Sequence, residues 1–141
     1  PWVAYGRSKT ANALMAVAFD ARFRDRNVRA CAASPGAVLE TKLTRHLSRE
    51  TLARMASGSG RRPTLKTLAE GAATQIWAAA VADADTIGGR YCENCGIAQI
   101  VNDPVLTDGV LPYAVDPIRA DTLWALSEKL VGESFPAPIR R

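Results

Sequence analysis

The sequence has 141 residues, of which 48% are hydrophobic and 23% are charged, and its net charge is +4. This length and composition suit one packed domain and exclude a disordered chain. The basic residues are scattered along the sequence, so we expect no nucleic-acid partner. No apolar run approaches the roughly 18 residues of a membrane span, and no signal-peptide pattern is present, so we expect no membrane span and a cytoplasmic location.

The first part of the chain predicts a long helix followed by a strand. From Tyr5 to about Arg26, apolar residues recur at helical spacing without an interrupting proline. Residues 28–33 are almost continuously apolar, which is typical of a strand that is covered on both faces. The sequence Ser34-Pro35-Gly36 then ends this strand as a turn.

Two further helices are predicted from their end signals. Thr67 and Glu70 have the spacing of a capping box, which predicts a helix over residues 67–81. A last helix over 116–132 has an aspartate cap, a proline at its first position and a glycine at its end. Between these helices, residues 87–92 predict a turn that leads into a second short strand.

Helices that alternate with short apolar strands indicate an α/β fold. Two strands are too few for a covered parallel sheet, so we expect its other strands to be absent from this chain, which does not begin with methionine. Residues 58–63 are predicted to be a flexible connector and residues 133–141 a loose tail.

Tyr5 and Lys9 are the strongest candidates for chemistry. Residues four apart on a helix share one face, so the phenol and the ammonium point into the same space. Moving a tyrosine pKa from near 10 toward neutrality requires about 4 kcal/mol, and one cation about 4 Å away supplies approximately that. Tyr5 is therefore a candidate general acid/base for a substrate oxygen while hydride moves at the adjoining carbon. The alternative is an ordinary helix start with a solvated lysine.

The surroundings of this pair resemble the short-chain dehydrogenases/reductases. That family carries Y-x-x-x-K, commonly as Y-x-x-S-K followed by Ala and Asn, and its next strand ends in Pro-Gly with a Thr soon after. In the same order, this chain has Tyr5, Ser8, Lys9, Ala11, Asn12, Pro35, Gly36 and Thr41. Segments 71–74 and 88–91 are similar to the branch of retinol-dehydrogenase-like and WW-domain-containing oxidoreductases.

For the fold, the resemblance implies the carboxyl-terminal part of a Rossmann-like, doubly wound parallel sheet whose first half is missing. Residues 1–141 then form one partial Rossmann-like domain. The family's Gly-rich turn and catalytic Ser lie upstream of its Tyr, so this chain alone is expected to lack the complete catalytic machinery of such an enzyme.

For the site, the resemblance implies that Tyr5 is the general acid/base and that Lys9 both lowers its pKa and binds the nicotinamide ribose. Pro35, Gly36, the backbone of Val38 and the hydroxyl of Thr41 are expected to hold the nicotinamide carboxamide. The implied cofactor is NAD or NADP, and the implied substrate is a small-molecule alcohol or carbonyl compound.

Two other classes of function stay open. The helix over 5–26 resembles the family element that packs against a partner subunit, so a homo-oligomer, or a catalytically inactive remnant that serves only as an association module, is an alternative. Cys92 and Cys95 form a C-x-x-C pair that suggests thiol redox chemistry. A metal site is not expected, because zinc needs about four ligands and no second pair completes the set. His46, the only histidine, is interpreted as a surface residue.

Overall fold

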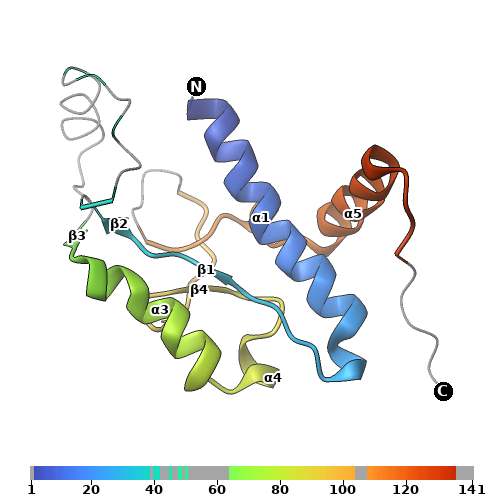
Figure 1. Ribbon diagram of the computed structural model, residues 1–141, viewed down its shortest axis with the longest axis horizontal. Coiled ribbons are helices and arrows are strands. Elements are labelled where there is room, and N and C mark those ends of the chain that lie inside the picture. The colour runs from blue at the N-terminus through green and yellow to red at the C-terminus, as the bar shows by residue number, and fades with distance from the viewer. Residues whose placement is uncertain are drawn as a thin grey trace.

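The computed structural model describes residues 2–38, 40–41, 45, 48, 50, 64–103 and 108–135. Of residue 2 it describes the backbone only. The connector predicted at 58–63 and the residue His46 lie outside the described part. Within it, helices pack around short strands, which confirms the α/β class (Figure 1).

The helix predicted from Tyr5 is confirmed. Helix α1 spans Trp2–Phe23 and continues into a 3-10 turn, η1, at Arg24–Arg26. Asn27 ends this segment with a φ of 59°, a left-handed conformation that asparagine tolerates better than most residues. The chain then reverses, and β1 runs back along α1 (Figure 1).

The strands form two small sheets. β1 (Ala32–Ala33) pairs in parallel with β4 (Tyr91–Glu93), and β4 pairs in antiparallel fashion with β5 (Gly96–Ile97). A second, two-stranded sheet joins β2 (Ala37–Val38) and β3 (Leu65–Lys66) in parallel. Helix α3 connects β1 to β4 and packs on both strands, on the side away from α1 (Figure 1).

The remaining elements follow β3 in chain order. They are α3 (Leu68–Ala80), α4 (Ala84–Ile87), the 3-10 turn η3 (Pro112–Ala114) and α5 (Pro117–Val131).

Two expectations for the sheet are wrong. The strand expected over 28–33 is ordered as a strand only at β1, which is half-buried rather than covered on both faces. Its first residues turn instead toward α1 and α4, because the Ala30 amide donates to Asp20 and the Ala30 carbonyl accepts from Gly89. The sheet is also mixed rather than wholly parallel, because the tight turn at Asn94 and Cys95 folds β5 back onto β4.

The predicted helix ends are confirmed. The Thr67 hydroxyl accepts from the Glu70 amide, and the Glu70 carboxylate accepts from the Thr67 amide at 2.8 Å. The Thr67 backbone bond, followed by its hydroxyl, lowers the pKa of Glu70. At the start of α5, Asp116 accepts from the Arg119 amide at 2.8 Å, and Gly132 ends the helix with a φ of 74°.

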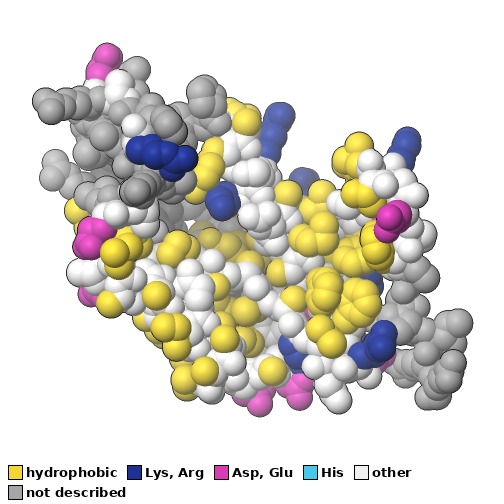
Figure 2. All heavy atoms as spheres, in the orientation of Figure 1, with side chains coloured by type: hydrophobic (Ala, Val, Ile, Leu, Met, Phe, Trp, Pro, Cys, Tyr) yellow, Lys and Arg dark blue, Asp and Glu magenta, His cyan; other side chains and the backbone are white. Residues whose placement is uncertain are grey.

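The main apolar core lies between α1 and α5. Its buried residues are Leu14, Ala18 and Ala120, against which Val17, Leu123 and Trp124 pack. The two alanines let the helices approach closely, and apolar side chains cover the surface around this contact (Figure 2). Leu130 and Val131, at the far end of α5, are exposed, because the described core ends near Trp124.

A buried ion pair fixes the other end of α1. Asp20 is 4% exposed and accepts from the Nε and Nη2 atoms of Arg29 at 2.9 and 3.1 Å. It also accepts from the Ala30 amide at 3.1 Å. Arg29 reaches the exposed Asp85 of α4 as well. This cluster joins the end of α1, the approach to β1 and α4, so it sets the direction in which β1 leaves α1.

We expect Asp20→Asn to destabilise the fold by about 3 kcal/mol at pH 7, since it leaves Arg29 without its buried partner. Burial alone would raise the pKa of Asp20, but the Arg29 and Ala30 hydrogen bonds and the nearby arginines outweigh it, so the pKa lies below its usual range. The carboxylate's contribution is therefore complete above its unfolded pKa of about 3.9 and is lost as pH falls through the folded pKa. Urea unfolding at pH 7, 4 and 2.5 should show the difference from wild type shrinking with acidity; a constant difference would contradict this.

We expect Gly88→Ala to destabilise the fold by about 2 to 3 kcal/mol. A Cβ at Gly88 would lie 1.8 Å from Arg29 Nη2 and 2.7 Å from Asp20 Oδ1, so Arg29 would have to withdraw from the ion pair. Gly6→Ala is the matched control, because nothing lies within 4 Å of its Cβ position and helix α1 should gain about 0.5 to 1 kcal/mol. Denaturant unfolding compares the two variants, and a shift of the same sign in both would refute the argument.

Candidate functional site

Tyr5 and Lys9 lie together on the first turns of α1. The Lys9 ammonium is 5.5 Å from the centroid of the Tyr5 ring, within the range of a cation–π contact. Tyr5 is 41% exposed. The Ser8 hydroxyl donates to the Tyr5 carbonyl at 2.7 Å, so it is engaged with the helix backbone. The structure therefore brings the predicted acid/base residue and its predicted cation to one side of the helix.

The Pro-Gly segment begins just after the carboxyl end of β1. Gly36 is exposed, has a φ of 71° and donates its amide to the Ser34 hydroxyl at 3.2 Å. Val38 lies in β2 and is half-buried, and the Thr41 hydroxyl donates to its carbonyl at 3.3 Å. Pro35 and Gly36 thus lie where open α/β sheets place their ligands, beyond the carboxyl ends of the strands.

Helix α3 packs closely against this segment. A Cβ at Gly71 would lie 2.5 Å from Val38 Cγ2 and 3.7 Å from the Pro35 carbonyl oxygen, so α3 approaches β2 as closely as a glycine allows. The close approach at Gly71 therefore fixes how near the Pro35 to Val38 segment lies to α3.

Three adjoining hollows, here called the edge furrow, connect the two parts of the expected site. Their volumes are about 210, 400 and 190 Å³. The first is lined by Lys9 and the third by Gly36, and the second shares walls with both. The shared residues are Val101 and Gly109 on one side and Glu93, Asn94 and Asp108 on the other.

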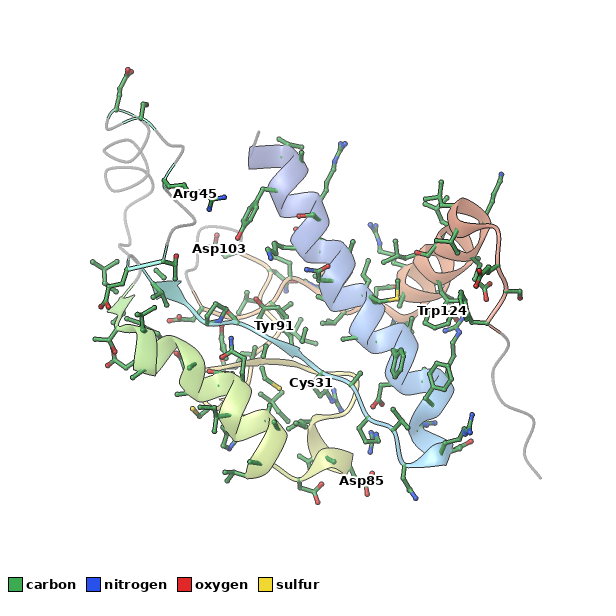
Figure 3. The ribbon with its side chains drawn as sticks, in the orientation of Figure 1. Cys31, Arg45, Asp85, Tyr91, Asp103 and Trp124 are labelled. Carbon is green, nitrogen blue, oxygen red and sulfur yellow. The ribbon has the colours of Figure 1, made fainter. Side chains whose placement is uncertain are left out.

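The position of the edge furrow follows from the fold. Because β1 runs back along α1, the start of α1 and the end of β1 lie toward the same end of the unit (Figure 1). Tyr91 of β4, which pairs with Ala32 of β1, and Asp103 both line the hollow beside Lys9; Figure 3 labels their side chains. Lys9 and Gly36, 27 positions apart in the sequence, thereby line the first and the third of three hollows that share wall residues.

Sequence reasoning missed three residues of the edge furrow. Tyr113 of η3 lines the hollow beside Lys9. Lys66 of β3 donates from Nζ to Asn94 Oδ1 at 2.5 Å, in the wall of the hollow beside Gly36. No periodicity or motif connects these positions, because they come together only through the turns of the sheet.

The cysteines do not form the pair suggested by C-x-x-C. Cys92 is fully buried, and burial, followed by the neighbouring Cys31, raises the pKa of its thiol to about 11. Cys95 is exposed, with its amide donating to the Thr74 hydroxyl at 3.3 Å. All three cysteines are free. In the part of the chain that the structure describes, no group of three or more His, Cys, Asp or Glu side chains is placed to hold a metal ion.

Together these features define an α/β protein in which a tyrosine and a lysine share one side of a helix, the lysine lining a furrow that reaches the carboxyl end of β1. No protein-family model and no solved structure matches the chain. Curated proteins do match the chain, and their names all describe oxidoreductases. It is 36% identical over 135 residues to the short-chain dehydrogenase/reductase prx1 of Penicillium roqueforti, an alignment that covers 95% of this chain and 39% of that protein.

Two further relatives are named oxidoreductases. A probable oxidoreductase of Streptomyces lividans is 38% identical over 130 residues, covering 88% of this chain and 43% of that protein. The WW domain-containing oxidoreductase of Homo sapiens is 33% identical over 131 residues, covering 93% of this chain and 28% of that protein.

The chain is thus similar over almost its whole length to proteins named short-chain dehydrogenase/reductase or oxidoreductase, and the family resemblance expected from its motifs is confirmed. It spans about two fifths of the length of the first of these relatives. No helix in the described part of the chain is both long enough and apolar enough to cross a membrane.

We expect alkylating reagents to distinguish the two cysteines of the C-x-x-C pair. At pH 8, Cys95 should react with iodoacetamide at least about 100-fold faster than Cys92, since the thiolate is the reactive form and burial suppresses it at Cys92. Mass spectrometry of the labelled peptides measures both rates. Cys95→Ser should remove the fast reaction and Cys92→Ser should leave it. Similar rates at both positions would restore the redox pair as a candidate.

Proposed function

We propose that this chain carries the acid/base pair and the nicotinamide side of the cofactor site of an NAD(P)-dependent short-chain dehydrogenase/reductase. Such an enzyme interconverts an alcohol and a carbonyl compound by hydride transfer. The proposal depends on one observation: Lys9, whose ammonium contacts the Tyr5 ring, lines one end of the edge furrow, and Gly36 lines its other end. The names of the relatives support this class of reaction.

We also propose that the chain corresponds to the carboxyl-terminal part of a Rossmann-like domain. The β1–α3–β4 unit is a parallel crossover of the kind from which such domains are built. Helices α1 and α3 cover the two sides of this unit, as a doubly wound sheet requires (Figure 1). The partial coverage of the relatives is consistent with this assignment.

The residues of the edge furrow fit the nicotinamide end of a dinucleotide better than its phosphates. Glu93 and Asp108 line the middle of the furrow, where their carboxylates would repel a pyrophosphate. A neutral carboxamide can donate to such carboxylates and accept from backbone amides. In this proposal, the backbone of Val38 and the hydroxyl of Thr41 bind the carboxamide beyond Pro35 and Gly36, and Lys9 binds the ribose.

In the proposed mechanism, the Tyr5 phenol gives its proton to the carbonyl oxygen during reduction and takes a proton from the alcohol during oxidation. Lys9 presents a positive charge to the negative charge that develops on the phenol oxygen, which lowers the energy of that transition state. A bound nicotinamide would supply or accept the hydride. Tyr91 and Tyr113 wall the hollow beside Lys9, so they limit the size of the group that can reach the acid/base pair.

We expect Tyr5→Phe to lower kcat about 100-fold or more in the complete natural protein that contains this sequence, because the transferred proton then has no donor. The affinity for NADH or NADPH should be unchanged within about threefold. Ser8→Ala is the matched control, since it removes a hydroxyl from the same helical turn that is bonded to the Tyr5 carbonyl. Steady-state kinetics and fluorescence titration measure both quantities.

Retention of turnover within about tenfold in Tyr5→Phe would disprove the acid/base assignment. If the wild-type protein self-associates but no dinucleotide binds to it, the association module is favoured instead. Self-association through α1 is a separate prediction, which sedimentation of the same protein tests.

A further inference from the structure

The side chain of Lys66 lies directly over Gly36. A Cβ built at Gly36 would be 2.9 Å from Lys66 Cε, 3.0 Å from Cδ and 3.1 Å from Nζ, all closer than an ordinary contact. The φ of 71° at Gly36 independently disfavours a side chain there. The aliphatic stem of Lys66 therefore fills the space beside the Pro35–Gly36 turn and restricts its movement.

The far end of Lys66 is anchored on a different element. Its ammonium donates to Asn94 Oδ1 at 2.5 Å in the turn between β4 and β5. That turn is tight, with φ values of 50° at Asn94 and 56° at Cys95, and the Cys95 amide donates to the buried Thr74 of α3. Lys66 thus connects the Pro35–Gly36 turn to a rigid part of the fold. The register of β2 and β3, with Val38 opposite Lys66, fixes the other end of its side chain.

This linkage is separate from the acid/base pair. Tyr5 and Lys9 stand on α1, whose main packing partners are α5, β1 and η3. Lys66 stands on β3, which packs on β2 and α3. A change at Lys66 should therefore alter the Pro35–Gly36 turn without moving the phenol or the ammonium of the acid/base pair.

We propose that Lys66 is a positioning residue that, through its bond to Asn94, holds the Pro35–Gly36 turn in the conformation that receives the nicotinamide end of the cofactor. This inference rests on the proposed function. It assigns cofactor affinity to a residue that does not take part in proton transfer. Loss of the ammonium leaves the Lys66 stem unanchored, so the turn samples other conformations and binding must select the competent one.

The first test measures dinucleotide binding in the complete natural protein. Lys66→Met keeps the stem and removes the ammonium, and Asn94→Gly removes the acceptor while still allowing the positive φ. Each should raise the Kd for NADH or NADPH about tenfold, with kcat within about threefold of wild type. Because both break one contact, the double variant should bind no more weakly than the single ones. Lys66→Arg should restore binding to within about threefold.

Lys129→Met is the matched control, since it removes the same ammonium from an exposed position near the end of α5. It should leave the Kd unchanged. The second test needs no cofactor: amide hydrogen exchange at residues 34–38 should quicken in Lys66→Met and in Asn94→Gly but not in the control. Exchange in α1 should be unaffected in all variants.

A Kd within about twofold of wild type in both Lys66→Met and Asn94→Gly would overturn the proposal. So would a lower unfolding temperature with unchanged dinucleotide binding, which would show a purely structural role. The outcome is independent of the Tyr5→Phe result. Tyr5→Phe without effect on kcat refutes the proposed reaction, whereas normal binding in the Lys66 and Asn94 variants refutes only the positioning role.

Discussion

The buried carboxylate of Asp20 is the constraint on which the geometry of the site depends. It holds Arg29 and the Ala30 amide at the end of α1, and so decides that β1 runs back along the helix. Only this return brings the first turns of α1 and the carboxyl end of β1 to the same end of the unit (Figure 1). A charge pair at one end of α1 thereby determines whether Lys9 and Gly36 can line one furrow at the other end.

Three glycines are required by close approach rather than by flexibility alone. Gly88 leaves room for Arg29, Gly71 for Val38 and Gly36 for Lys66. Each lies where one element touches the next: α4 to the end of α1, α3 to β2, and β3 to the turn after β1. The distance between each pair of elements is thus set by the absence of a side chain.

Much of the fold was predictable from local signals. The capping box of Thr67 and Glu70 and the aspartate cap of α5 appear where their residue types predicted them, because both motifs are satisfied by atoms within four positions of each other. The strand lengths were not predictable, since two-residue strands leave no periodic pattern. Arg29 also diverts the start of β1 toward Asp20, a contact that no local pattern reports.

The residues of the candidate site were likewise predictable only in part. The spacing of Tyr5 and Lys9 on a helix was enough to predict that they share one side, because helical geometry fixes it. Lys66, Asn94 and Tyr113 could not be assigned, since they reach the edge furrow from three different elements. The C-x-x-C spacing suggested a pair that the structure does not form. Cys92 and Cys95 are close in sequence, but Cys92 is buried beside Cys31 and Cys95 is exposed.

The charges along the edge furrow are nearly balanced. Lys9 and Lys66 contribute two positive side chains, against the carboxylates of Glu93, Asp103 and Asp108. Dissolved ions screen both signs in such a mixed set, so the attraction of this edge for the uncharged ring of a reduced nicotinamide, the ligand proposed above, hardly changes. In the proposed function, ionic strength should therefore act on NADH or NADPH binding through the phosphates and hardly at all through this edge of the sheet.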